Sequence, residues 1–198
     1  MPEEETLERR RFLLLFGVQR SIRYHARRRS HFDQLNRMTV LISLLFGSAT
    51  FAALLGKLGG DAAVLWFAGV VTVASAIDLV LGSSVRARGH HDFERRWTAL
   101  EQELVRVGEY DDARLREFLE KRLSIEADEE PALRVLNIMC HNELTRAIGS
   151  NGPFYKVGWL RRALSQWYDL QPDSIKERPA QDSQIPRAPS GVSTPEPG

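Results

Sequence analysis

Two long segments without charge, separated by a very short connection, constrain the fold of this chain more than any other feature. The first, residues 38–56 (MTVLISLLFGSATFAALLG), has no charged side chain and is bracketed by Arg37 and Lys57. As a helix these residues rise about 28 Å, close to the roughly 30 Å hydrocarbon core of a bilayer. A buried core helix of a soluble protein usually shows a polar edge, whereas the hydroxyls here can bond back to their own helix. We therefore predict a transmembrane helix over residues 38–56.

The second segment covers residues 62–85 (AAVLWFAGVVTVASAIDLVLGSSV), and Asp78 is its one charged residue. Arg86 and Arg88 close it. The connection, residues 57–61, is too short for anything but a tight turn. The two predicted spans therefore run antiparallel and pack as neighbours in a hairpin.

Basic residues gather at the two outer ends of this hairpin. They are Arg20, Arg23, Arg27, Arg28, Arg29 and Arg37 before the first span, and Arg86, Arg88, Arg95 and Arg96 after the second. The connection carries only Lys57. Because basic flanks stay in the cytoplasm, both chain termini are predicted to face it.

The rest of the composition excludes several classes of protein. The formal net charge of +1 argues against a generally basic nucleic-acid binder. A single cysteine, Cys140, excludes a disulfide framework and a cysteine-based zinc site. The sequence contains no nucleophile elbow, P-loop or HExxH motif. We predict a protein that is not an enzyme, with no cofactor and no metal site.

Amphipathic helices are predicted on both sides of the hairpin. Residues 5–36 read as one long helix, and residues 88–108 carry apolar side chains at spacings of 4, 3, 4 and 3. These side chains are Phe93, Trp97, Leu100, Leu104 and Val107. Since the hairpin brings the two helices out side by side, we predict that they form an antiparallel cytoplasmic stalk that continues it.

The remainder is predicted to form small cytoplasmic helices over residues 111–170 and a polar, proline-rich, disordered tail over residues 171–198. Gly108 interrupts the preceding helix, and Asp111 or Asp112 caps the next. The acidic cluster 126–130 with Pro131 is expected to start a further helix. No strand is predicted. The fold class is therefore an all-α membrane protein.

Small residues recur at helical spacing on both spans. Ser48, Ala52 and Gly56 share one face of the first span, and Ala68, Thr72 and Ala76 share one face of the second. Such faces let helices approach closely in lipid. They serve either the packing of the hairpin itself or contacts between subunits of a homo-oligomer, and both can hold on different faces.

Asp78 is the most informative single residue, because a carboxylate inside a span costs about 2.5–3.5 kcal/mol at the bilayer centre. Three interpretations stay open. Asp78 lines or gates a pore, it forms a structural hydrogen bond to Ser43 or Thr39 on the first span, or it snorkels to the headgroups near Arg86.

Two further groups of polar residues are candidates for binding. Arg23, Arg27, Arg28 and Arg29 could hold a nucleotide phosphate or anionic headgroups, and we favour the headgroups. His25, His90 and His91 could meet at the base of the stalk as a proton or metal sensor. The alternative for these histidines is a solvated or interfacial position.

The text SIRYHARRRSHFDQLNRMT entering the first span, and RARGHHDFERRW leaving the second, resemble the SLATT domain. That family is a bacterial two-transmembrane effector domain associated with SMODS nucleotide-second-messenger synthases and SLOG sensors. The resemblance covers residues 5–125, and no sensor domain is recognisable in this chain.

The resemblance implies a multi-pass protein of the bacterial inner membrane. It further implies an antiphage or conflict effector that oligomerises and forms a pore, or perturbs the membrane, in response to a signal such as a nucleotide. The implied partners are membrane lipids, further copies of the chain and a separate signal-producing or sensor protein, with no nucleic acid. The alternative is a non-conducting membrane anchor or scaffold whose helices 111–170 bind a partner protein.

Overall fold

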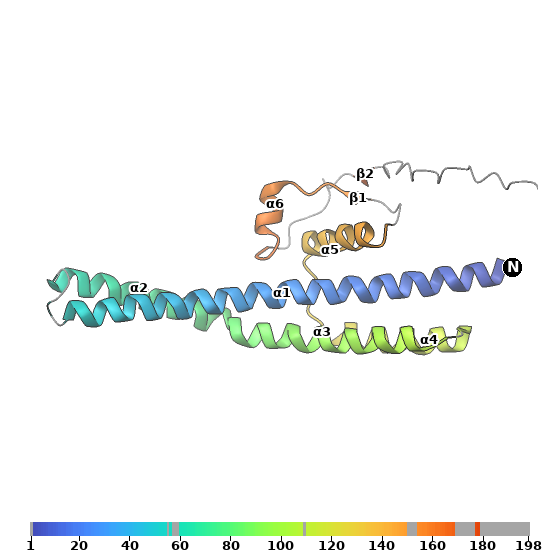
Figure 1. Cartoon of the computed structure of the whole chain (residues 1–198), viewed down its shortest axis with the longest axis horizontal. Helices are drawn as coiled ribbons and strands as arrows, with labels where there is room; N and C mark the ends of the chain where they lie inside the picture. The colour runs from blue at the N-terminus through green and yellow to red at the C-terminus, as the bar shows by residue number, and fades with distance from the viewer. Residues whose placement is uncertain are drawn as a thin grey trace, which may run out of the picture.

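The computed structural model describes residues 2–54, 56, 60–108, 110–149, 154–168 and 177–178. These residues are mostly helical (Figure 1). The elements in chain order are α1 (Pro2–Leu54), α2 (Gly60–Leu81), α3 (Ser83–Arg106), α4 (Asp112–Asp128), α5 (Arg134–Ala147), β1 (Phe154–Tyr155), α6 (Trp159–Leu164) and β2 (Glu177–Arg178).

Helix α1 runs the length of the molecule (Figure 1). Its 53 residues correspond to about 80 Å at the usual helical rise. No proline follows Pro2 within it, and its interior glycines, Gly17 and Gly47, are single and far apart. The predicted helix 5–36 and the predicted span, from residue 38 as far as Leu54, are therefore one uninterrupted helix.

Helix α2 lies alongside the C-terminal part of α1, and we call residues 38–54 together with α2 the apolar hairpin. Gly56 and Gly60 adopt positive φ angles of 67° and 71° at the turn, which glycine tolerates without steric cost. No residue of α2 is buried. The two helices are long and apolar enough to cross a membrane. A core helix of a soluble protein would instead be mostly buried.

The second apolar segment ends earlier than predicted. Helix α2 stops at Leu81, Gly82 takes a left-handed conformation (φ 58°), and α3 starts at Ser83 rather than at residue 88. The Gly82 N–H donates to the Asp78 carbonyl at 2.8 Å, and the Gly82 carbonyl accepts from the Arg86 N–H at 3.0 Å. One glycine therefore closes the first helix and opens the second.

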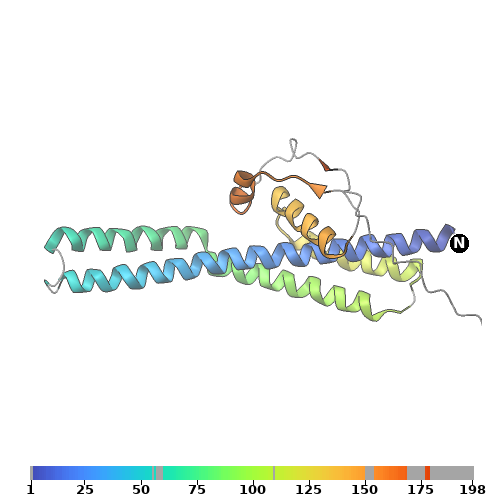
Figure 2. The same cartoon turned by 45° about the horizontal axis from the view of Figure 1, so that its top comes forward.

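The remaining part of the chain, residues 2–37 and 82–168, is called the polar half. Helix α3 packs against α1 as the 88–108 pattern predicts, and α4 folds back beside α3 (Figures 1 and 2). The core consists of Leu14, Val18, Trp97, Leu100, Leu104, Leu115, Phe118 and Ile125. The predicted break at Gly108 is confirmed, and the Asp111 carboxylate caps α4 by accepting from the Arg114 N–H at 2.7 Å.

The predicted helix start at the acidic cluster is wrong. Residues 126–128 end α4, Glu129 lies in the connection, and α5 begins only at Arg134. The acidic side chains have partners in the polar half instead, because Asp128 pairs with Arg96 at 2.8 Å and Glu129 with His25 at 3.0 Å. Helix α5 lies on the opposite side of α1 from α3 (Figures 1 and 2).

One short strand pair departs from the prediction of helices alone. β1 and β2 pair antiparallel, with Phe154 opposite Arg178 and Tyr155 opposite Glu177. A two-residue strand carries no alternating pattern that a sequence could reveal. Asn142 of α5 fixes β1, because its side chain donates to the Tyr155 carbonyl at 2.7 Å and accepts from the Tyr155 N–H at 3.0 Å. Apart from β2, the predicted disordered tail 171–198 lies outside the described residues.

Candidate functional site

Buried polar side chains gather where the apolar hairpin meets the polar half. His25 is 3% exposed and Arg28 is 8% exposed, both on α1. They face α3 on one side and the connection between α4 and α5 on the other. Burial of this kind is costly unless the polar groups find partners, so their hydrogen bonds define the site.

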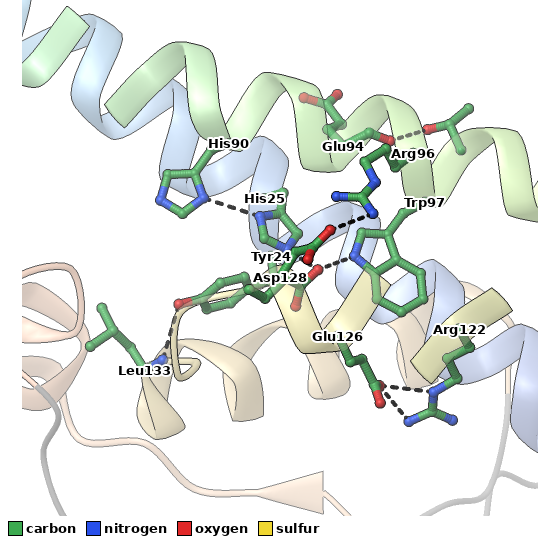
Figure 3. Close-up of polar contacts among 12 residues, drawn as sticks. Tyr24, His25, His90, Glu94, Arg96, Trp97, Arg122, Glu126, Asp128 and Leu133 are labelled. Atoms are coloured by element: carbon green, nitrogen blue, oxygen red, sulfur yellow. Dashed lines mark hydrogen bonds and ion pairs between the residues drawn. The ribbon is translucent and has the colours of Figure 1, made fainter. Parts of the chain in front are cut away.

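A histidine pair forms the centre of this site. The Nδ1 atoms of His25 and His90 are 3.1 Å apart (Figure 3). The Nε2 atom of His25 lies 3.0 Å from a carboxylate oxygen of Glu129. Since that carboxylate accepts, His25 donates from Nε2. If His25 is neutral, His90 donates from Nδ1; if His25 is charged, the direction reverses. The two rings thus share one proton position.

Glu129 also accepts a hydrogen bond from the indole N–H of Trp97, a side chain that is fully buried. Beside it, the Tyr24 hydroxyl accepts from the Leu133 N–H at 3.0 Å (Figure 3). Two successive residues of α1, Tyr24 and His25, therefore hold the connection between α4 and α5. Burial raises the pKa of Tyr24, which keeps this phenol neutral.

His90 is held in its neutral form. Burial, followed by the neighbouring His25 and Arg28, lowers the pKa of His90 to about 4. Its ring stacks on Phe32 with centroids 5.8 Å apart, and the Arg28 guanidinium lies 4.6 Å from the same Phe32 ring. A proton added to His90 would stand next to a cation, which is why neutrality is favoured.

A cavity of about 390 Å³ opens beside the histidine pair. His25, Arg28, Arg86 and His90 line it together with Asp128 and Glu130. Arg28 closes one wall by donating from Nη1 to the Gln166 carbonyl at 2.6 Å. The lining combines two cations, two carboxylates and aromatic rings, so it suits a polar group of mixed charge better than an apolar ligand.

The four predicted arginines do not form one cluster. Arg27 pairs with Glu143 at 2.5 Å and Arg29 with Glu94 at 2.8 Å, while Arg23 donates to the carbonyl of Gln19 on its own helix at 3.3 Å. Of the four, only Arg28 lines the cavity. The second cation there is Arg86, which the sequence placed only at the boundary of the span.

The predicted small-residue faces lie mostly outside the hairpin interface. Ser48, Gly56, Thr72 and Ala76 are exposed, and Ala52 and Ala68 are half-buried. The hairpin is packed through other residues: Phe46 meets Phe67 with ring centroids 6.0 Å apart, and Ala53 is buried. The exposed faces therefore stay open to contacts outside this chain.

Asp78 lies on the half-buried stripe of α2. Val64, Phe67, Val71, Ala74 and Asp78 follow each other at spacings of 3, 4, 3 and 4, and all are half-buried. Its Oδ1 atom is buried and has no hydrogen-bond partner among the described residues. The Thr39 hydroxyl donates to the Leu35 carbonyl of its own helix at 3.2 Å. An apolar environment without a partner makes Asp78 an expensive residue to retain.

Neither a metal site nor a reactive cysteine emerges in the part of the chain that the structure describes. No group of three metal-ligating side chains comes together there. Cys140 is buried, and burial raises the pKa of its thiol to about 11, so it remains a protonated thiol at neutral pH.

No family model, no curated protein and no solved structure matches this chain. The histidine pair was within reach of sequence reasoning, since the hairpin places His25 and His90 on facing helices. Glu129, Trp97 and Tyr24 were missed as its partners, because nothing local indicates which carboxylate of an acidic run turns inward.

Proposed function

We propose that this protein is a bacterial membrane effector that inserts its apolar hairpin in the inner membrane. In this proposal several copies associate and open a pore, or perturb the bilayer, when the polar half receives a signal. The observation that carries the proposal is the continuity of α1. One helix joins the buried site around His25 to the hairpin, so a displacement at one end moves the other.

The hairpin itself supports insertion. Only 6% of the most apolar stretch of the first candidate span is buried in the protein, and none of that of the second. Such a surface is stable only in lipid or against further protein. In the proposed orientation both termini lie in the cytoplasm, because the arginines flank the open end of the hairpin.

Association of copies is supported by the faces that the hairpin leaves uncovered. Ser48 and Gly56 on one helix, and Thr72 and Ala76 on the other, are exposed small residues. Small residues let helices of neighbouring subunits approach closely. Asp78 lies on the half-buried stripe of α2 that faces α1, so in this proposal its carboxylate meets water only when the two helices of a hairpin move apart.

The trigger is part of the proposal as well. The resemblance to the SLATT domain favours a signal from a separate protein of an antiphage or conflict system, with a nucleotide as one candidate. The cavity lined by Arg28, Arg86 and the two histidines is where the polar half could receive it. No enzymatic step is required of this chain.

The test is membrane potential and dye entry in bacteria during induced expression. Wild type is compared with Asp78→Asn, and Asp61→Asn in the first turn of α2 serves as a matched carboxylate control. We expect depolarisation with wild type and with Asp61→Asn, and its loss or reduction with Asp78→Asn. Equal depolarisation by all three would remove Asp78 from the mechanism. Full membrane insertion without depolarisation, even with the conflict-system partners present, would contradict the effector.

A non-conducting anchor is the second candidate. It was predicted to dock a partner through the apolar stripes of residues 111–170. The structure uses the stripes of α4 and α5 within the chain, because Leu115, Phe118, Leu136 and Leu144 are all buried. We therefore prefer the effector. A stable monomer in detergent and in lipid would favour the anchor.

A further inference from the structure

An exposed aromatic patch on α6 and the residues after it has no role in the function proposed above. Trp159 is 80% exposed, Leu160 54%, Trp167 47% and Tyr168 63%. Four large apolar side chains within ten residues are unusual on a surface that faces water alone. The core of the polar half does not use them, since the described part of α6 has no buried residue.

Two contacts fix this patch near the base of the apolar hairpin. The Trp167 ring meets the His31 ring edge-on at 5.0 Å, and the Gln166 carbonyl accepts from Arg28 at 2.6 Å. His31 precedes Met38, where the charge-free segment begins, by seven residues of the same helix, or about 10 Å. Figures 1 and 2 both show α6 on the side of α1 at this level, close to the end of α2 and the start of α3.

The headgroup layer of a bilayer lies at about this level. It adds roughly 5–8 Å to each side of the hydrocarbon core. Tryptophan and tyrosine are enriched in this layer, because each combines an apolar ring with a polar N–H or O–H. The composition of the patch thus agrees with the position that its contacts impose.

The charges next to the patch fit an anionic surface. Arg161 and Arg162 belong to α6, and Arg86 lines the adjoining cavity. None of the three forms an ion pair within the described residues. By contrast, Arg27 and Arg29, the neighbours of Arg28 in α1, are paired with Glu143 and Glu94. Unpaired arginines beside exposed indoles are the combination that binds anionic phospholipid headgroups.

We propose that residues 159–168 form a third membrane contact, an interfacial anchor that lies in the anionic headgroup layer beside the base of the hairpin. It goes beyond the proposed function and rests on its first step, the insertion of the hairpin. Because Arg28 and His31 hold this anchor against α1, lipid packing at the headgroups would bear directly on the buried histidine site.

The test uses the full chain in vesicles of phosphatidylcholine and phosphatidylglycerol, with a fluorescent label at one introduced cysteine. Cys140 is buried with its thiol pKa raised to about 11, so it does not compete for the label. Three exposed positions are compared: Ala163→Cys on α6, Leu79→Cys in the hairpin and Ala147→Cys at the end of α5. Quenching is measured with lipids that carry a nitroxide at the headgroup or deep in the acyl chain.

We expect the label at 163 to be quenched mainly by the headgroup nitroxide, at least twofold more than the label at 147. The label at 79, two residues before the end of α2, should be quenched by both nitroxides and well above the label at 147. If 163 behaves like 147 while 79 is quenched, the anchor is wrong and insertion stands. If 79 is unquenched, insertion itself fails. A label at 163 that is shielded from water yet unquenched by lipid would mean a protein neighbour, such as a second copy, and would also overturn the anchor.

A second variant tests the chemistry of the contact without threatening the fold. Trp159→Ser removes a side chain that is 80% exposed, so the packing of the polar half should not change. In the protein labelled at 163, we expect headgroup quenching to fall severalfold, with the label at 79 unaffected. Vesicles without phosphatidylglycerol should lower the signal in the same direction. If quenching at 163 is unchanged both in Trp159→Ser and in vesicles without phosphatidylglycerol, the contact depends neither on the aromatic ring nor on anionic lipid, and the anchor is wrong.

Discussion

Along α1, the same helix packs in two different ways. Residues 38–54 meet α2 with only Ala53 fully buried, whereas the segment from Leu14 to Phe32 meets α3, α4 and α5 with two clusters of buried apolar side chains and a buried polar network. The polar half is therefore held together by contacts within the chain. The hairpin depends on what surrounds it, because nearly all its apolar surface faces outward. Truncating an apolar side chain should therefore cost much stability in the polar half and little in the hairpin.

The largest contrast is expected between Trp97→Ala and Leu79→Ala. Trp97 is fully buried and donates its indole N–H to Glu129, so its truncation should lower the free energy of unfolding by about 3–5 kcal/mol. Leu79 is 85% exposed in the hairpin, and its truncation should cost well under 1 kcal/mol in detergent. Thermal unfolding followed by circular dichroism measures both. Equal losses would mean that the hairpin has a protein-packed core of its own.

A smaller contrast separates two neighbouring carboxylates of the polar half. Glu129 accepts from His25 and Trp97 and is 16% exposed, so Glu129→Gln should cost about 1.5–3 kcal/mol. Asp128 is 59% exposed and pairs with Arg96, itself 41% exposed, at 2.8 Å, so Asp128→Asn should cost under about 1 kcal/mol. The ratio of the two losses shows whether burial, rather than charge count, stabilises the α4–α5 connection. If Asp128→Asn cost more stability than Glu129→Gln, the exposed Asp128–Arg96 pair would be the main stabilising contact of the connection.

These contrasts also show what the sequence could predict. The two charge-free segments and the 4, 3, 4, 3 spacing of Phe93 to Val107 are local patterns, and each maps onto one helix face. The hairpin and its packed base follow from them. The N-cap at Asp111 and the break at Gly108 are local signals too, and both are present in the structure.

The features that the sequence did not predict depend on contacts between residues far apart in the chain. Arg27 and Arg29 looked alike in the sequence, yet their partners Glu143 and Glu94 lie on two different helices. The acidic run 126–130 has a favourable composition for a helix start, but contacts with His25 and Arg96 hold it at a helix end. No spacing rule selects such partners, because they are set by the arrangement of helices far apart in the chain.

His90 gives the polar half a pH dependence. The pKa of His90 is lowered from its ordinary 6.5 to about 4, so the folded protein binds this proton more weakly than the unfolded chain. As the pH falls from about 6.5 to 4, the unfolded chain binds the proton before the folded protein does, so the free energy of unfolding decreases. Above pH 6.5 the neutral His90 makes its full contribution to stability. Because His90 is only partly buried, we expect the loss in free energy of unfolding over this pH range to be about 1–2 kcal/mol.

The comparison of His90→Phe with wild type isolates this effect from the titration of other groups. The phenyl ring keeps the stacking on Phe32 and removes the proton site. Between pH 7 and 4 the free energy of unfolding should fall less steeply in His90→Phe than in wild type. The two curves should differ most at the acidic end. His91→Gln, at a half-exposed neighbouring position, keeps His90 and serves as the matched control. Parallel curves for all three proteins would show that His90 does not titrate in this range.

The finest test lies at the junction between the two regions. Gly82 has a φ of 58° with open space around its Cα, so Gly82→Ala should cost about 1 kcal/mol through backbone conformation alone. Gly89, seven residues later inside α3, is also in open space but has helical backbone, so Gly89→Ala should gain about 0.5–1 kcal/mol. Opposite signs in thermal unfolding would establish that the break at Gly82 is a fixed joint separating hairpin from polar half. A gain at both positions would mean that α2 and α3 prefer to be continuous, and then a push on α3 would reach Asp78 directly.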